Sequence, residues 1–467
     1  MSTTTRARKI AWAGLKGLGW LLLALLGLLL AWLASNNRWV DAREVAVPAA
    51  LQPPAPALPA ERNGFFALLG LDAPAGQDPA EAGRRRWAAG STASTAPPEA
   101  GALRWPAPGP DDPASSWHCR ADAQDCLARW SEQAAALQAL MREHAVLGER
   151  CEALASPGFA IDELRPEPRA EIRTPADQYA GRAMVSVASW IQCGRWLRVQ
   201  AALAQQRGDA SALQGALQRS QRYVNGLLTG ARSLMGNLVA WAVAGEHWQL
   251  LTALAARQPA LAESLAQLAG PLPAAALDPS RWMVSEAFYG RQLNRELVQA
   301  CGMNMPGAGP AGWLERRLSC SPFGLMPQAT QQLMDRQWLQ ALELARGGPL
   351  ALLDWRPQPE GTRLFGVAWS NTAGHVLVDV AMPAYPEQGR RQADLLLRHQ
   401  AALLALGAAA QPAARRAAWL AAQPLDERLR ARIRLEGAQL SLSLWSPPGE
   451  PARPLRYPLS SFSSSSS

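Results

Sequence analysis

The side chains best suited to covalent, acid–base or metal chemistry are scarce in this chain of 467 residues, and its six cysteines are the most informative of them. They are Cys119, Cys126, Cys151, Cys193, Cys301 and Cys320. An even number of cysteines in an exported domain favours disulfides. Among the 15 connectivities that six cysteines allow, sequence separation favours Cys119 with Cys126 and Cys301 with Cys320, which leaves Cys151 for Cys193.

A metal site is the alternative use of the first two cysteines. His118, Cys119 and Cys126 offer ligand types that zinc accepts. Their spacing fits no common zinc pattern, and the chain contains no C-x-x-C or H-x-x-x-H motif. The sequence therefore favours a disulfide and predicts neither a metal nor a cofactor.

Lysine and histidine chemistry is largely excluded. Both lysines, Lys9 and Lys16, lie near the N-terminus, so the rest of the chain has no lysine for a Schiff base, a Ser-Lys dyad or a P-loop. No H-E-x-x-H or G-x-S-x-G motif organises the histidines, which are His118, His144, His247, His375 and His399. We expect His144, on an apolar helical stripe, to be a hydrogen-bonded core residue.

One segment resembles part of an enzyme family. The run Ser319–Pro327 (SCSPFGLMP) is similar to the G-L-M-Q neighbourhood of lytic transglycosylases, helical and often membrane-anchored enzymes that act on the cell wall. The resemblance implies a protonated glutamate as general acid, about 15 positions before the glycine. Gly309 stands there, whereas Glu315 is closer and precedes Arg316, which favours the ionised carboxylate. Pro327 also replaces the glutamine.

A second set of carboxylates lies on a predicted helix further upstream. Glu286 and Glu296 accompany Arg291 and Arg295, but the spacings form no ideal ion pair. A solvated helix face is the expected role. We therefore predict no catalytic residue and keep a cell-wall hydrolase built around Glu315 or Glu296 as the alternative.

The formal net charge of +8 does not indicate a nucleic-acid-binding protein. Arg6, Arg8, Lys9 and Lys16 supply four of the 46 basic residues, and every acidic residue lies after them, the first being Asp41. The remaining 42 face 38 acidic residues over more than 400 positions. A nearly balanced surface is not the footprint expected for a polyanion.

The N-terminal segment has the composition of a membrane span. No charged residue occurs over 17–37, which is rich in leucine, and Trp12, Trp20, Trp32 and Trp39 lie toward its ends. We predict a transmembrane helix over 10–37 in contact with the lipid bilayer, with residues 1–9 as a cytoplasmic tail because the basic residues precede it. A cleavable signal peptide is the alternative. The long apolar run and the lack of a small-x-small site favour an uncleaved signal anchor.

The remaining chain is predicted to be mainly helical. Residues 38–116 form a Pro/Ala/Gly-rich linker with an apolar segment at 65–71, which either packs on its own domain or contacts a partner near the membrane. Residues 117–350 form a helical domain in the periplasm, residues 351–459 a mainly helical C-terminal subdomain, and residues 460–467 a Ser-rich tail.

Short breaks at 206–209, 229–230 and 258–259 separate successive helical patterns and predict antiparallel hairpins. Further helices are expected at 279–300, 327–346 and 389–410. The fold class is therefore all-α: one transmembrane helix, then a stack of hairpins as a TPR-like α-solenoid or an irregular bundle. Minor β structure is expected at 361–369, at 375–380 and at 439–445, the last pairing with 455–459.

A broader resemblance rests on the segment WLRVQAALAQQRGDASALQGALQRSQRYVNGLLTGARSLMGNLVAWAVAGEHWQLLTAL and on SEAFYGRQLNREL, NTAGHVLVDV and LRYPL. In these, residues 180–460 resemble bacterial inner-membrane-anchored helical proteins of unknown function. The resemblance implies a helix, not a strand, at His375–Val380. It supplies no activity.

A stack of helical hairpins forms an extended concave surface, and such surfaces mostly bind other chains. We therefore expect a non-catalytic scaffold or adaptor that is anchored in the bacterial inner membrane and binds another envelope protein. Tryptophan, tyrosine and arginine are favoured interface anchors, and the candidates are Arg195, Trp196, Arg222 and Tyr223. Trp241 and Trp248 are more typical of core. A signalling role is disfavoured, because the cytoplasmic tail is shorter than any domain.

Overall fold

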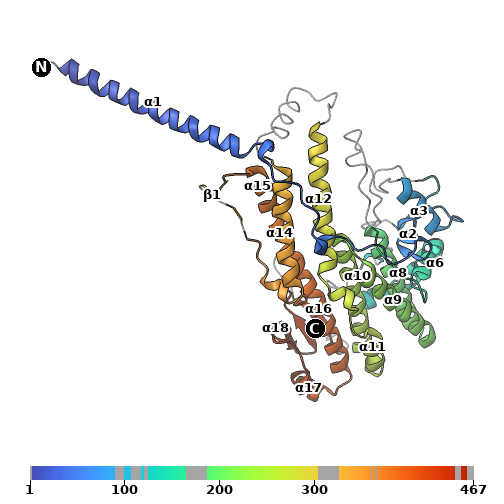
Figure 1. Ribbon diagram of the computed structural model, residues 1–467. Coiled ribbons are helices and arrows are strands. Elements are labelled where there is room, and N and C mark those ends of the chain that lie inside the picture. The colour runs from blue at the N-terminus through green and yellow to red at the C-terminus, as the bar shows by residue number, and fades with distance from the viewer. Residues whose placement is uncertain are drawn as a thin grey trace. The chain divides into compact units, whose positions relative to one another are not determined.

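The computed structural model describes residues 3–89, 99–106, 117–119, 125–164, 187–302, 325–358, 360–361, 363–364, 367–446 and 454–459. These residues are mostly helical, with a small three-stranded sheet near the C-terminus, which confirms the predicted fold class (Figure 1). They divide into two compact units. The first comprises Met1–Gln52, Ala287–Gln340 and Arg356–Tyr385, and the second comprises Pro53–Glu286, Ala341–Trp355 and Pro386–Ser467.

The first unit begins with the long helix α1 (Thr3–Ser35). Its segment Leu15–Ser35 has a mean hydropathy of 2.2, and its leucine side chains are exposed from Leu15 to Leu30. By length and composition this helix is able to cross a membrane.

The end of α1 is hydrogen-bonded to chain segments more than 280 positions away. The Asn36 side chain donates to the Trp369 carbonyl (2.7 Å) and accepts from the amide of Thr372 (2.8 Å). Asp41 accepts from the amides of Gln328 and Ala329, each at 2.9 Å, at the start of α14 (Pro327–Ala345). A carboxylate there satisfies free helical N–H groups and complements the helix dipole.

The rest of the first unit contains the hairpin β1 (Arg363–Leu364) and β2 (Val367–Ala368), the helix α15 (Thr372–Ala381), the 3-10 helix η8 (Met382–Ala384) and the second part of α12 (Ser280–Gly302). The hairpin lies in the predicted β segment at 361–369.

The strand expected at 375–380 is wrong, and the helix implied by the resemblance is correct. Asn371 adopts a left-handed conformation (φ 49°) and directs the chain into α15. Gly374, Val378 and Met382 then follow at intervals of four and are buried. Gly374 is required here, because a Cβ would lie 2.0 Å from Thr330 Oγ1. Packing at helical spacing has overridden the β-branched composition.

The second unit is built on three long helices, α8 (Val187–Gln206), α9 (Ala210–Gly230) and α10 (Leu234–Arg257). Their ends confirm the predicted breaks at 206–209 and 258–259, whereas the second break lies at 231–233, just after the predicted 229–230. Gly208 turns the chain between α8 and α9 with φ 69°, and Asp209 then caps α9 by accepting from the Ala212 amide at 2.9 Å. Fully buried Leu197, Leu227 and Leu251, one from each helix, lie in the core.

Further helices, most of them shorter, accompany these three. They are α2 (Gly64–Leu69), α3 (Pro79–Ala89), α4 (Cys126–Glu132), α5 (Ala134–Glu143), α6 (Ala145–Leu154), α11 (Ala262–Ala269), α16 (Tyr385–Ala409), α17 (Arg416–Ala422) and α18 (Glu427–Arg430). The helix expected around His144 breaks at that residue, which lies between α5 and α6 and is only partly buried. His144 is therefore not the core histidine that we expected.

The apolar segment 65–71 belongs to the core of the second unit. Phe65, Phe66 and the neighbouring leucines are buried in α2 and the turn after it. Arg150 on α6, itself buried, donates to the carbonyls of four residues that follow, namely Leu71, Ala73, Pro74 and Gln77. Of the two interpretations of this segment, the structure supports packing on its own domain. The predicted linker therefore contains a folded helical pair.

The C-terminal sheet has the order β3 (Ile433–Glu436), β4 (Gln439–Leu442), β5 (Leu455–Pro458), all antiparallel. The pairing of β4 with β5 confirms the predicted β pair, whereas β3 was not expected. Asp394 on α16 accepts from the amides of Trp445 (2.8 Å) and Ser446 (2.9 Å). Burial raises the pKa of this carboxyl group to about 6.

Candidate functional site

Two disulfides lie in the second unit, and one of them joins a short helix to the three-helix core. Cys119 is bonded to Cys126 at the start of α4, and Cys151 on α6 is bonded to Cys193 on α8, with Cα separations of 5.6 and 5.1 Å. Both pairs match the pairing expected from the sequence. The third expected pair, Cys301–Cys320, lies outside the residues whose side chains are described.

The Cys119–Cys126 disulfide also removes the zinc alternative. Both sulfurs are used in the S–S bond, so no thiolate from this pair is free to ligate a metal. The third member of the group, His118, has its Nδ1 atom 3.0 Å from Nη1 of Arg195. Burial and the adjacent guanidinium lower the pKa of His118, which favours the neutral ring.

The predicted interface residues are mostly interior. Arg195 is 6% exposed, Trp196 and Tyr223 are also buried, and only Arg222 lies at the surface. Arg222 donates to the Ala155 carbonyl at 2.7 Å, and the Tyr223 hydroxyl donates to the Trp190 carbonyl at 3.0 Å. These residues hold the hairpins together, and their contact with a partner remains a prediction. Trp241 and Trp248 are buried, as core residues are.

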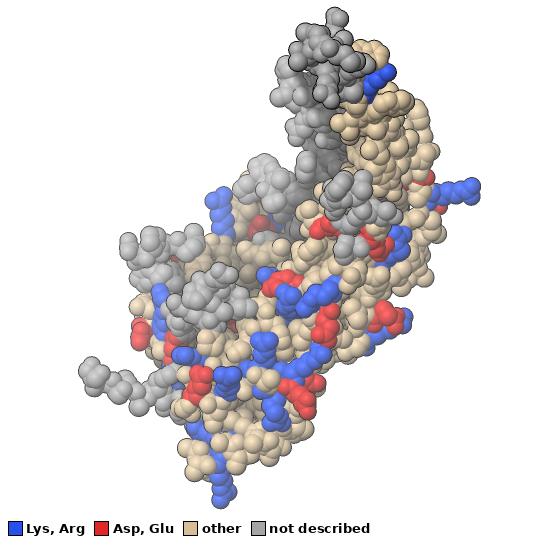
Figure 2. Space-filling view, turned by 90° about the vertical axis from the view of Figure 1, so that its left-hand side faces the viewer, with Lys and Arg blue, Asp and Glu red and all other residues tan. Residues whose placement is uncertain are grey.

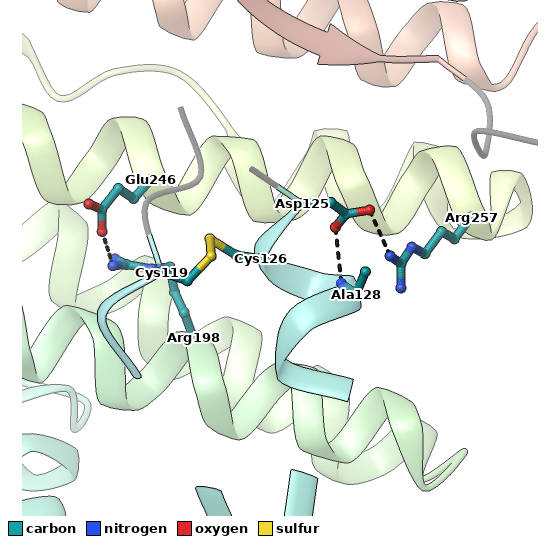
Figure 3. Close-up of a disulfide and its surroundings, with 7 residues drawn as sticks. All are labelled: Cys119, Asp125, Cys126, Ala128, Arg198, Glu246 and Arg257. Atoms are coloured by element: carbon teal, nitrogen blue, oxygen red, sulfur yellow. Dashed lines mark hydrogen bonds and ion pairs between the residues drawn. A yellow bond between two sulfur atoms is a disulfide. The ribbon is translucent and has the colours of Figure 1, made fainter. Parts of the chain in front are cut away.

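An ion pair lies inside the core between α8 and α10. Arg198, 2% exposed, contacts Glu246, as Figure 3 shows beside the Cys119–Cys126 disulfide. Burial lowers the pKa of both Arg195 and Arg198, to about 10 for Arg195, whose pKa the neighbouring Arg198 lowers further. Glu246 opposes this effect, so one carboxylate serves two buried guanidinium groups.

His247 is a structural residue next to this ion pair. Its Nδ1 atom lies 2.9 Å from Ser220 Oγ and its Nε2 atom 2.9 Å from Gln221 Oε1. Complete burial lowers the pKa of His247 to about 3. A ring that stays neutral at physiological pH and has both nitrogens engaged is not placed for proton transfer.

The strongest candidate for binding is an open groove of about 380 Å³ on the second unit. Its charged side chains come from different places: Arg142 on α5, Arg207 in the turn after α8, and Arg219 on α9. The other lining residues are Gln138, Met141, Gln200, Leu203, Ala204, Ala212 and Ala216. No lining residue is acidic, so the groove combines positive charge with a partly apolar surface.

One of the three arginines, Arg219, is held in place by Gln200 on α8 and Glu152 on α6. Arg219 Nη2 donates to Gln200 Oε1 at 3.4 Å, and its Nε lies 3.8 Å from a carboxylate oxygen of Glu152. Gln200 in turn donates to Glu152 at 2.5 Å. Arg142 and Arg207 are exposed and have no ion-pair partner among the described residues. These two guanidinium groups are therefore available to an incoming anionic group.

The sequence did not single out this groove. Arg207 and Arg219 are 12 positions apart on either side of the hairpin turn at Gly208, so the antiparallel packing of α8 and α9 brings them to one groove. The position of the turn was predicted from the sequence. The approach of Arg207 and Arg219 could have been inferred by pairing the charged residues on either side of that turn. The contribution of Arg142 depends on tertiary packing.

A second pocket, of about 340 Å³, lies in the first unit and has mixed charge. Asp41, Glu44, Arg291, Arg295 and Asp335 are among its lining residues. Arg291 is buried and donates to Asp335 Oδ1 from Nε and Nη2 at 3.1 and 2.8 Å, which differs from the solvated role expected for it. Opposite charges that already pair leave little net charge for a ligand.

The described part of the chain does not test the hydrolase alternative, which depends on Glu315 and Glu296; Glu286, the other carboxylate of the predicted helix, has a structural contact. Glu286 accepts a hydrogen bond from the amide of Leu234 at 3.3 Å, at the start of α10. Glu315 lies outside the described residues, as does the side chain of Glu296.

Comparison with known proteins gives no match to a family model, to a curated protein or to a solved structure. The functional interpretation therefore depends on the geometry and charge of the sites described above.

Proposed function

We propose that this chain is a single-pass inner-membrane protein of a bacterium with two membranes, and that its helical domain is a non-catalytic adaptor in the periplasm. In this proposal α1 is an uncleaved signal anchor and the N-terminus is cytoplasmic. The groove formed by α5, α8 and α9 binds an acidic segment of another envelope protein. The observation that carries the proposal is the convergence of three arginines with no acidic residue lining the groove.

The cellular location is supported by two properties of the chain. The basic residues Arg6, Arg8, Lys9 and Lys16 precede the apolar part of α1 or lie at its start, which favours a cytoplasmic N-terminus. The disulfides lie after this helix in the sequence, and disulfides persist in oxidising compartments such as the periplasm.

A protein segment fits the groove better than a nucleic acid does. On the face drawn in Figure 2, which does not include the groove, basic and acidic side chains are interspersed, with no extended basic stripe for a phosphate backbone. The groove itself also presents apolar atoms of Met141 and Leu203 beside the arginines. Arginine forms bidentate hydrogen bonds with carboxylates. A partner segment with an acidic side chain or a terminal carboxylate next to an apolar residue therefore matches both the arginines and the apolar atoms of the groove.

The proposal is tested by photo-cross-linking in intact cells, with p-benzoylphenylalanine replacing Met141 in the groove. We expect one discrete adduct with another envelope protein, identified by mass spectrometry. Arg142→Glu combined with Arg207→Glu should lower the adduct yield at least tenfold, because each charge-assisted hydrogen bond contributes about 1.5–3 kcal/mol. Both arginines are exposed, so the fold should tolerate the change.

The matched control places the same cross-linker at Ala139, which is exposed on α5 and does not line the groove. Equal adduct yields at positions 139 and 141, or an adduct unaffected by the double charge reversal, would contradict binding in the groove.

A further inference from the structure

Helix α15 of the first unit exposes three large apolar side chains, together with the charged Asp379, on the side that faces away from its own core. Its buried stripe consists of Gly374, Val378 and Met382. On the opposite side Val376 is 53% exposed and Val380 75% exposed, and Leu377 beside them is 45% exposed. Residues four apart share one face of a helix. A helix that is apolar on both faces normally has both faces covered.

The start of α15 is attached to the end of α1. Trp32 Nε1 donates to Thr372 Oγ1 at 3.2 Å, and the Asn36 side chain accepts from the amide of Thr372 at 2.8 Å. Within the first unit, Figure 1 accordingly draws α15 beside the end of α1. Trp32 lies three positions before the last residue of α1, where tryptophan prefers the headgroup level of a bilayer.

This attachment limits how far α15 can lie from the end of the apolar part of α1. A helix of ten residues is about 15 Å long. Since its first residue contacts Trp32, no part of α15 lies much more than about 15 Å from the level of Trp32. The exposed valines are thus within reach of the same membrane interface.

We propose that the face formed by Val376, Leu377 and Val380 rests on the lipid bilayer in which α1 is anchored, as a second membrane contact of the first unit. The inference depends on the insertion of α1 stated under the proposed function. The partner of this face is the phospholipid interface of the bilayer, because α15 begins beside the end of the membrane helix α1 itself. Interfacial helices bury an apolar face at the boundary of headgroups and acyl chains in this way.

The test uses the full chain in nanodiscs of phosphatidylethanolamine and phosphatidylglycerol. p-Benzoylphenylalanine replaces Val380, and lipid adducts are quantified by mass spectrometry after irradiation. Leu22 in α1 serves as the reference for insertion, and Gln340, exposed on α14 in the first unit, serves as the solvent control. We expect the adduct yield at 380 to be within about threefold of that at 22 and at least tenfold above that at 340.

Each other outcome has a separate meaning. Lipid adducts at 22 but only the background yield at 380 would overturn the proposal and leave the anchor intact. Adducts at 380 that contain protein in place of lipid would overturn the proposal and show that another protein chain covers this face. Background yields at both positions would overturn the insertion of α1 together with the inference.

A charge substitution tests the same face independently. With the cross-linker at 376, Val380→Glu should lower the lipid adduct yield at least fivefold, because a carboxylate disfavours burial of this face, whereas Val380→Ile should retain it. An undiminished yield with Val380→Glu would contradict the proposal.

Discussion

Glu246→Gln is expected to lower the free energy of unfolding by about 3–5 kcal/mol. The substitution preserves the size of the side chain but removes the carboxylate that offsets the buried charges of both Arg195 and Arg198. An unpaired buried charge is far more costly than a lost surface pair, because water no longer solvates it. Chemical unfolding of the full chain in detergent, followed by circular dichroism, measures the change.

The control for this prediction is the ion pair between Arg257 and Asp125, which Figure 3 also shows. It is partly solvent-exposed and joins α10 to the start of α4, so Arg257→Gln should cost less than about 1 kcal/mol. The double variant Arg198→Met with Glu246→Leu should recover part of the stability, since it removes both members of the buried pair and leaves only Arg195 without the carboxylate. Similar losses for Glu246→Gln and Arg257→Gln would contradict the account of the buried pair.

Removal of the Cys151–Cys193 disulfide is expected to have the second large effect. Its sequence separation of 42 gives a loop-closure contribution of about 4 kcal/mol, against about 2.4 kcal/mol for Cys119–Cys126, whose separation is 7. The double variant Cys151→Ala with Cys193→Ala should therefore unfold at a lower denaturant concentration than Cys119→Ala with Cys126→Ala. The two variants are matched, because each removes one buried disulfide from the same unit.

The denaturant midpoints of the two variants and of the parent chain decide this prediction. An equal or larger loss on removing the shorter loop would show that local strain or packing, not loop length, determines how these bonds stabilise the unit.

Local signals in the sequence predicted much of the fold. The leucine run predicted α1, and Pro327 marked the start of α14 at the residue where the structure has it. The helix expected at 389–410 corresponds to α16, Tyr385–Ala409. The break between α8 and α9 was placed correctly, whereas the break between α9 and α10 lies just after the predicted residues. In each of these cases the signal is local, because it is the spacing of apolar residues or a turn residue within or next to the element itself.

Contacts between distant segments could not be predicted in this way. Asp41 caps a helix 287 positions later, and nothing near Asp41 in the sequence indicates its partner. Arginine is usually exposed, so composition gave no reason to place Arg195 and Arg198 in the core. In the candidate groove, the turn between α8 and α9 was predicted, but the approach of Arg142 from α5 depends on how the hairpins pack.

The central claim, that a membrane anchor precedes a disulfide-bonded domain outside the cytoplasm, is tested most directly by the thiol state of the protein taken from cells. Intact cells are treated with a permeant alkylating reagent, and membranes are washed with alkaline carbonate. The pelleted protein is then reduced and labelled with a second reagent of different mass. We predict that Cys119, Cys126, Cys151 and Cys193 in the pellet carry only the second label. First-reagent labelling of these cysteines, or recovery of the chain in the carbonate supernatant, would contradict the account.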